Sequence, residues 1–166
     1  PIFSSQVSST DKRTELWNIV KDVKSLLNDS GVVFPGKADL EISHHYGIDN
    51  YYETGLTMIT VVNREYCKKI LVSLPGQNHP EQYHKKKEET FIVLHGDVQL
   101  KLDGQIKILS RGDVVTIKSG VRHEFTTING CIIEEISSTH YTNDSFYTDE
   151  LIVKNKHRKT HLTKWR

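Results

Sequence analysis

The sequence has 166 residues with 22 basic and 21 acidic side chains, and its formal net charge is +1. A chain of this length fits one domain of roughly 100–200 residues, and so small a charge gives no support to nucleic acid or an anionic membrane as a dedicated partner. Two cysteines, Cys67 and Cys131, are too few for a disulfide framework or a cysteine-rich zinc module. No stretch approaches the roughly 20 apolar residues of a membrane span, and no apolar leader opens the sequence. We therefore expect a cytoplasmic protein that binds a small ligand.

The first predicted element is an amphipathic helix over residues 10–28. Its apolar side chains recur at the spacing of one helix face, and Gly31 follows its end. These side chains are Leu16, Ile19, Val20, Val23, Leu26 and Leu27. We assign residues 1–30 to an amino-terminal helical segment that packs on the rest of the domain.

After Gly31 the pattern changes to short runs rich in β-branched residues, such as TGLTMITVV, KKILVSL, TFIVLHG and CIIEEIS. Runs of this kind predict an all-β sandwich or small barrel. The Asp-Gly pair of LDGQ (102–105) and the Asn-Gly pair of ING (128–130) favour tight hairpins, so the sheet should be mostly antiparallel. We assign residues 31–153 to this β domain, and the basic residues 154–166 to a tail that becomes ordered only against a partner.

The stretch HPEQYHKKKEETF, residues 79–91, is either a solvated charged loop or half of a metal site. On a strand, Gln82 and His84 would share one face, and Glu89 follows beyond a lysine-rich turn. Far downstream, His123 follows a Gly-x-x-His turn. Two imidazoles and one carboxylate suit a first-row divalent ion and leave positions open for substrate, which is typical of a catalytic site.

The spacing of these residues resembles that of the cupin family. The positions that match its first motif are Gly76, Gln82, His84, Glu89 and Gly96, and those that match its second are Gly112, Gly120 and His123. Gln82 stands where the family has His, and Lys118 and Thr127 replace the usual proline and asparagine. The resemblance implies a cupin fold, a jelly-roll-like small barrel or double-stranded β-helix. It also implies a metal inside one mouth of the barrel, held by the two histidines, the glutamate and Gln82.

Longer segments between residues 41 and 149 are similar to D-lyxose-isomerase-type sugar isomerase cupins. They are even more similar to the cupin domain attached to some sialic acid (N-acetylneuraminate) synthases. These segments are EISHHYGIDNYYETG, NREYCKKILVSLPGQNHPEQYHKKKEETF and EEISSTHYTNDSFYTD. The resemblance implies a sugar or sugar acid as ligand, makes Lys87 a substrate-binding candidate, and suggests a homodimer, since cupins are often dimers.

Gln82 is the main departure from the family pattern. An amide oxygen is a weaker ligand than imidazole, so we expect weaker metal binding or only three protein ligands. His79 is the alternative ligand, but its odd offset from His84 turns it to the other strand face unless a bulge redirects it. Otherwise we interpret His79 as a loop histidine at the barrel rim.

Glu134 and Glu135 are the candidates for a general base beside the metal, since one of two neighbouring strand residues points into the barrel. The alternation of the strand does not show which one points inward, because isoleucines share a strand face with each of them. Of the three consecutive lysines, only Lys87 is given an inward role, which is to stabilise negative charge or to hold a sugar oxygen. His140 and Tyr141 are expected to line the entrance.

Three functions follow from these residues. The first is a metal-dependent sugar isomerase that converts an aldose to a ketose through an enediolate. The second is a non-catalytic sugar-binding or regulatory module of a sialic-acid-synthase-type protein, and the third an iron-dependent oxygenase. The ligand set accepts Zn, Mn, Fe, Co or Ni, so the sequence leaves the identity of the metal open.

Overall fold

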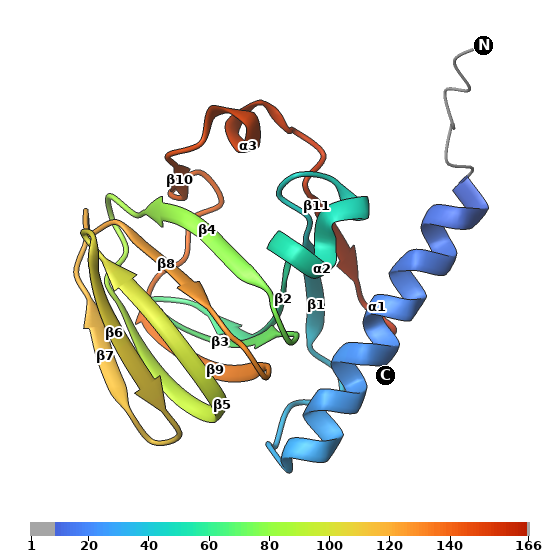
Figure 1. Ribbon diagram of the computed structural model, residues 1–166, viewed down its shortest axis with the longest axis horizontal. Helices are drawn as coiled ribbons and strands as arrows, with labels where there is room; N and C mark the ends of the chain where they lie inside the picture. The colour runs from blue at the N-terminus through green and yellow to red at the C-terminus, as the bar shows by residue number, and fades with distance from the viewer. Residues whose placement is uncertain (1–8, 166) are drawn as a thin grey trace.

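The structure, a computed structural model, describes residues 9–165 (Figure 1). Its helices are α1 (Ser9–Ser30), the short 3-10 helix η1 (Ile48–Asn50), α2 (Tyr51–Thr54) and α3 (Glu150–Lys154). Its strands are β1 (Asp39–Ser43), β2 (Leu56–Asn63), β3 (Tyr66–Ser73), β4 (Asn78–Tyr83), β5 (Glu89–Leu102), β6 (Gln105–Ser110), β7 (Val114–Ile117), β8 (His123–Thr126), β9 (Cys131–Ser138), β10 (Phe146–Tyr147) and β11 (Lys159–Leu162). The amphipathic helix predicted over residues 10–28 is thus confirmed as the core of α1.

The strands form one curled, antiparallel sheet, as Figure 1 shows. The order along the sheet is β10-β4-β8-β5-β9-β3-β2-β1-β11, and β6 and β7 pair with β5 as branches off this path. All of these pairings are antiparallel. The predicted all-β, mostly antiparallel architecture is confirmed.

The long strand β5 joins the two walls of the curled sheet. Its first part, up to Gly96, pairs with β9 and β7, whereas its second part, from Asp97, pairs with β6 and β8. Gly96 has a φ of 83°, and a Cβ atom there would lie 1.9 Å from the carbonyl oxygen of Gly130. Only glycine fits this crossing point, because it combines a left-handed backbone with a very close backbone approach.

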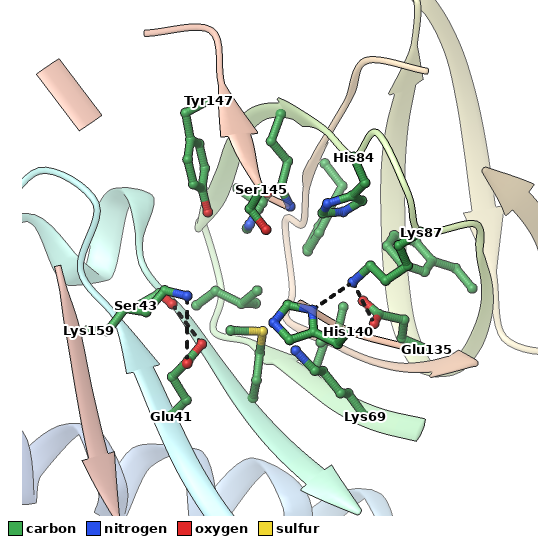
Figure 2. Close-up of a pocket in the computed structure, with 17 residues that line it drawn as sticks. Glu41, Ser43, Lys69, His84, Lys87, Glu135, His140, Ser145, Tyr147 and Lys159 are labelled. Carbon is green, nitrogen blue, oxygen red and sulfur yellow. Dashed lines mark hydrogen bonds and ion pairs between the residues drawn. The ribbon is translucent and has the colours of Figure 1, made fainter. Parts of the chain in front are cut away.

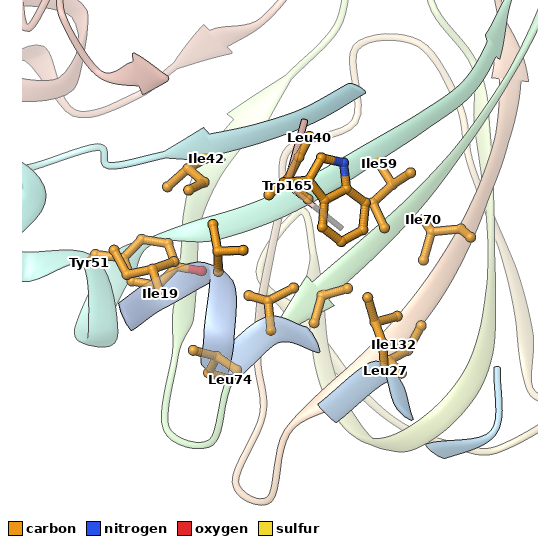
Figure 3. Close-up of a cluster of buried hydrophobic side chains, with 13 residues drawn as sticks. Ile19, Leu27, Leu40, Ile42, Tyr51, Ile59, Ile70, Leu74, Ile132 and Trp165 are labelled. Atoms are coloured by element: carbon orange, nitrogen blue, oxygen red, sulfur yellow. The ribbon is translucent and has the colours of Figure 1, made fainter. Parts of the chain in front are cut away.

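Both faces of the β1–β2–β3–β9 wall are covered, and each has its own core. The outer face packs against α1, through the buried residues Ile19, Val20, Val23, Leu27, Leu40, Ile42, Ile59, Ile70, Val72 and Ile132 (Figure 3). The inner face and the opposite wall enclose a second cluster, which includes Leu71, Phe91, Val93, Leu100, Phe125 and Ile133. The inner side chains are apolar at one end of the barrel and polar at the other, and the polar end holds the site described below.

One of the two predicted hairpins is confirmed. Asp103 and Gly104, both with positive φ, form the turn between the paired strands β5 and β6. The prediction for Asn129-Gly130 is wrong, because the strands on either side of it, β8 and β9, pair with other strands and not with each other. Gly130 instead lets the chain pass from one wall to the other.

The expectation of a basic tail at residues 154–166 is also corrected. Strand β11 pairs with β1 at the edge of the sheet, over Lys159 to Leu162. Trp165 is 4% exposed in the core beneath α1, and its indole Nε1 donates a 2.8 Å hydrogen bond to the carbonyl oxygen of Ala38. This segment therefore folds against the domain itself. None of the helices in residues 9–165 is long and apolar enough to cross a bilayer.

Candidate functional site

Three of the predicted ligands meet at the polar end of the barrel. His84 follows β4, Glu89 begins β5 and His123 begins β8, and each offers a ligand atom within 4.8 Å of the others. The Oε1 atom of Glu89 lies 3.4 Å from Nε2 of His84 and 3.0 Å from Nε2 of His123. All three side chains are buried. We call this group the His84–Glu89–His123 triad.

Backbone carbonyls orient both imidazoles of the triad. Nδ1 of His84 lies 2.8 Å from the carbonyl oxygen of Asp144, and Nδ1 of His123 lies 2.9 Å from that of Val121. A carbonyl oxygen only accepts, so each Nδ1 donates, and in the neutral form of each ring Nε2 carries the lone pair. These Nε2 atoms and both carboxylate oxygens of Glu89 are buried, with no hydrogen-bond partner among the described residues. Oε2 of Glu89 has an ion pair with Lys87, but the two Nε2 atoms and Oε1 converge on one another. Three converging acceptors are costly on their own, so the ligand set fits a first-row divalent ion.

The three residues of the triad shift one another's pKa values. Burial by itself would raise the pKa of Glu89, but the imidazoles of His123 and His84 and the ammonium group of Lys87 hold that pKa well below its usual range. Burial opposes protonation of His123, whereas the adjacent Glu89 carboxylate favours it and raises the pKa of His123 overall. Glu89 is therefore ionised at neutral pH, which is the form of a carboxyl group that can bind a metal ion.

Asp144, which sequence reasoning missed, holds the turn between β4 and β5. Its carboxylate accepts hydrogen bonds of 2.9 to 3.2 Å from the backbone N–H groups of Lys85, Lys86 and Lys87. Its own carbonyl oxygen accepts the hydrogen bond from His84. One residue thus fixes both the lysine-rich turn and the ring of a predicted ligand.

The lysine-rich turn sends its three side chains in different directions. Lys87 is 3% exposed and points inward, with Nζ 3.3 Å from Oε2 of Glu89, 3.2 Å from Oε2 of Glu135 and 3.3 Å from Nδ1 of His140. The exposed side chains of the other two lysines instead lie over the aromatic rings of Phe146 and Tyr141. Lys87 therefore bridges the triad and the wall that β9 forms.

The two glutamates of β9 lie on opposite faces. Glu135 points into the barrel and is 5% exposed, whereas Glu134 points outward, with Oε1 3.8 Å from Nζ of Lys68. Burial and the nearby Glu89 carboxylate raise the pKa of Glu135, although Lys87 acts in the opposite direction. A carboxylate whose pKa is raised toward neutrality, and that touches a buried ammonium, is suited to accept and return a proton.

A bulge in β4 places His79 and Gln82 on the same inner face. His79 pairs with Phe125 and Gln82 pairs with His123, so β4 has one more residue than β8 between these pairs. His79 is 4% exposed within a strand, which corrects the interpretation as a rim loop residue. Its ring stacks on that of Phe125 at a centroid distance of 5.0 Å, and it is not part of the group whose ligand atoms lie within 4.8 Å.

A pocket of about 40 Å³ lies beside the triad (Figure 2). His84, Lys87, Glu135 and His140 line it, as do Gln82 and His79. Sequence reasoning missed six further polar residues in its lining, which are Glu41, Ser43, Lys69, Ser145, Tyr147 and Lys159. Of the two residues expected at the entrance, His140 lines the pocket, whereas Tyr141 is 44% exposed beside it.

Replacing Gln82 with His is expected to tighten metal binding, by about 10-fold or more, because imidazole is the better ligand for these ions. The measurement is titration of the metal-free protein with Zn²⁺ or Mn²⁺ in a calorimeter. Glu81→His is the matched control, because Glu81 is the neighbouring residue and bonds Thr148 outside the pocket. Equal or weaker affinity in Gln82→His would mean that Gln82 is not a ligand.

Comparisons with known proteins agree with this geometry. Residues 70–130, which contain Gln82 and the whole triad, match the cupin domain family. The D-lyxose/D-mannose isomerase of Thermosediminibacter oceani is 26% identical over 174 residues, which cover 86% of this chain and 96% of that protein. The mannose-1-phosphate guanylyltransferase of Salmonella montevideo is 28% identical over 108 residues, which cover 64% of this chain and 21% of that protein.

Solved structures show the same fold. The L-ribose isomerase of Cellulomonas parahominis, solved with L-ribose, superimposes with a TM-score of 0.71 over 86% of this chain and 94% of that one, at 13% identity. The same enzyme without ligand gives a TM-score of 0.70. The match over residues 70–130 and the shared fold together show that this chain has the cupin fold.

Proposed function

We propose that the protein is a metal-dependent sugar isomerase that interconverts an aldose and a ketose. The observation that carries the proposal is that the buried carboxylate of Glu135 lies one lysine away from the triad, with Lys87 between them. The similarity to a D-lyxose/D-mannose isomerase over most of both chains supports the same reaction class. Each part of such a reaction has a residue in the pocket.

The triad and Gln82 would hold the ion. A bound divalent ion would polarise the sugar carbonyl and stabilise the enediolate that forms when the neighbouring carbon loses its proton. The orientation of both imidazoles by backbone carbonyls keeps their Nε2 atoms aimed at one point, so the ligands are organised before the ion binds.

Glu135 is the proposed base. An ordinary glutamate is too weak a base to remove a carbon-bound proton efficiently, and the raised pKa of Glu135 brings it closer to the operating range. Burial also limits access of bulk water, so a proton taken from one carbon can be returned to the next. Lys87, held between Glu89 and Glu135, would donate a hydrogen bond to a sugar oxygen as negative charge develops there.

Deuterium exchange tests the proposal directly. The metal-loaded protein in heavy water is expected to introduce deuterium at the carbon next to the carbonyl of at least one pentose or hexose, followed by NMR. Exchange reports proton abstraction even where net conversion is small. The control is the same protein with its metal removed by a chelator. Binding of metal and sugar without exchange across the panel would contradict the isomerase and leave a non-catalytic sugar-binding module.

A further inference from the structure

A second cavity opens outward from the catalytic pocket. Its volume is about 490 Å³, against about 40 Å³ for the pocket beside the triad. The two cavities share four lining residues, Glu41, Lys69, His140 and Lys159, and therefore adjoin each other. We call the outer one the rim cavity. Its remaining lining residues are Thr60, Thr142, Lys156, His157, Arg158 and His161.

The rim cavity is strongly basic. Four fixed cations line it, Lys69, Lys156, Arg158 and Lys159, together with three histidines, but only one carboxylate, that of Glu41. The chain as a whole has a formal net charge of only +1, so this concentration of positive charge is local. Surface lysines alone would not define a site, and the decisive residue is the buried one.

Lys69 is a buried cation without an anionic contact. It is 5% exposed on the inner face of β3, lines both cavities, and points into the pocket in Figure 2. Across residues 9–165 its ammonium group makes neither an ion pair within 4.0 Å nor a hydrogen bond. Burial lowers the pKa of Lys69, and the more distant Glu135 offsets part of that cost. A buried ammonium group left in this state calls for a bound anion.

Among the described residues, no other charged side chain of the rim cavity supplies an anionic partner for Lys69. Oε1 of Glu41 lies 3.8 Å from Nζ of Lys159 and 3.7 Å from Nε2 of His161, so the carboxylate is already shared between two partners. Arg158 is partly occupied as well, because its Nη1 donates to the carbonyl oxygens of Ile152 and Asn155. Lys69 remains the cation best placed to receive a ligand.

The sizes of the two cavities indicate which end of a bound sugar lies beside the triad. The pocket beside the triad is far smaller than the rim cavity, about 40 Å³ against about 490 Å³, so it suits the reacting end of a sugar. The rest of its carbon chain extends toward Lys69, which lies where the pocket meets the rim cavity. We propose that the substrate is a sugar with an anionic group, a phosphate or a carboxylate, at the end remote from its carbonyl, and that Lys69 binds that group. This inference rests on the proposed isomerase function.

The test compares three ligands that differ only at the remote end, which are D-mannose, D-mannose 6-phosphate and D-mannuronate. Calorimetry on the metal-loaded protein is expected to give at least one anionic sugar a Kd lower than that of D-mannose by about 10-fold or more. The comparison of phosphate with carboxylate identifies the anion. Lys69→Met, which keeps the length of the side chain without its charge, should bring the ratio of the two Kd values close to one.

Lys68→Met is the matched control, because Lys68 is the next residue of β3 and pairs with Glu134 on the outer face. This variant should keep the full preference for the anionic sugar. If Lys69→Met fails to fold, Lys159→Gln at the junction of the cavities should reduce the same preference. Equal affinity for D-mannose and both anionic sugars, or a preference that survives in these variants, would overturn the proposal.

Deuterium exchange on the same ligands separates this inference from the isomerase function. Tight, Lys69-dependent binding of an anionic sugar without exchange would contradict isomerisation while the anion site stands. In the opposite outcome, D-mannose and the anionic sugars bind with equal affinity, and deuterium exchange into D-mannose is at least as fast as into the anionic sugars. That result would support the isomerase and contradict the anion site.

Discussion

Glu135→Gln is expected to lower the turnover number by a factor on the order of 100 or more, with little change in metal content or in sugar affinity. The amide keeps the size and hydrogen-bonding capacity of the carboxylate but cannot accept a proton from carbon. Because Glu135 faces the pocket beside Lys87, the substitution removes the proposed base and leaves the triad in place. The measurement is the rate of deuterium exchange into the sugar carbon, with metal content determined on the same sample.

Glu134→Gln is the matched control for this experiment. Glu134 is the adjacent residue of β9, but its side chain lies on the outer face beside Lys68, so turnover should stay close to that of the unmodified protein. An equal loss in both variants would point to damage to the strand. An undiminished rate in Glu135→Gln would exclude this carboxylate as the base.

The cupin fold and the triad could be predicted because their signals are local. Each half of the site is a spaced motif around a turn: His84 and Glu89 flank the lysine-rich turn, and His123 follows its own glycine turn. Strand positions near a turn have a fixed offset from it, so spacing alone brings these side chains to the same end of the barrel. Hairpin chemistry at Asp103-Gly104 is local in the same way, and that turn forms where it was predicted.

The choice between Glu134 and Glu135 could not be made from the sequence, and the packing explains why. A strand with one wet face alternates between apolar and polar residues, but the first part of β9, residues 131–133, is buried on both faces. Ile132 packs under α1 and Ile133 packs inside the barrel, so apolar residues occupy both parities. Only the tertiary position of α1 reveals which face is which.

Other parts of the site depend on contacts between distant segments. Asp144 holds the lysine-rich turn from nearly 60 residues away, and no local pattern marks it. Lys69 follows Lys68 in β3, and a surface position would have been the ordinary interpretation for either lysine. The rim cavity needs β11, which the sequence suggested to be a tail because its residues are basic. The basic residues that were expected to form a tail line a cavity instead.

His123→Ala is expected to lose the metal. The imidazole of His123 is one of only two in the triad, and its removal leaves Glu89 and His84 to hold the ion. Loss of an outer contact to a ligand typically weakens metal binding about 10- to 100-fold, so loss of the ligand itself should cost about 100-fold or more. Metal analysis after dialysis should show a near-empty protein, and deuterium exchange should be abolished with it.

The melting temperature gives this prediction a second readout. A bound ion stabilises only the folded state, so addition of metal should raise the melting temperature of the unmodified protein and leave that of His123→Ala unchanged. His95→Ala is the matched control, because His95 is a partly buried strand histidine outside both the triad and the pocket. Its metal content and its thermal response to metal should equal those of the unmodified protein. Full metal content in His123→Ala would rule out the triad as the metal site.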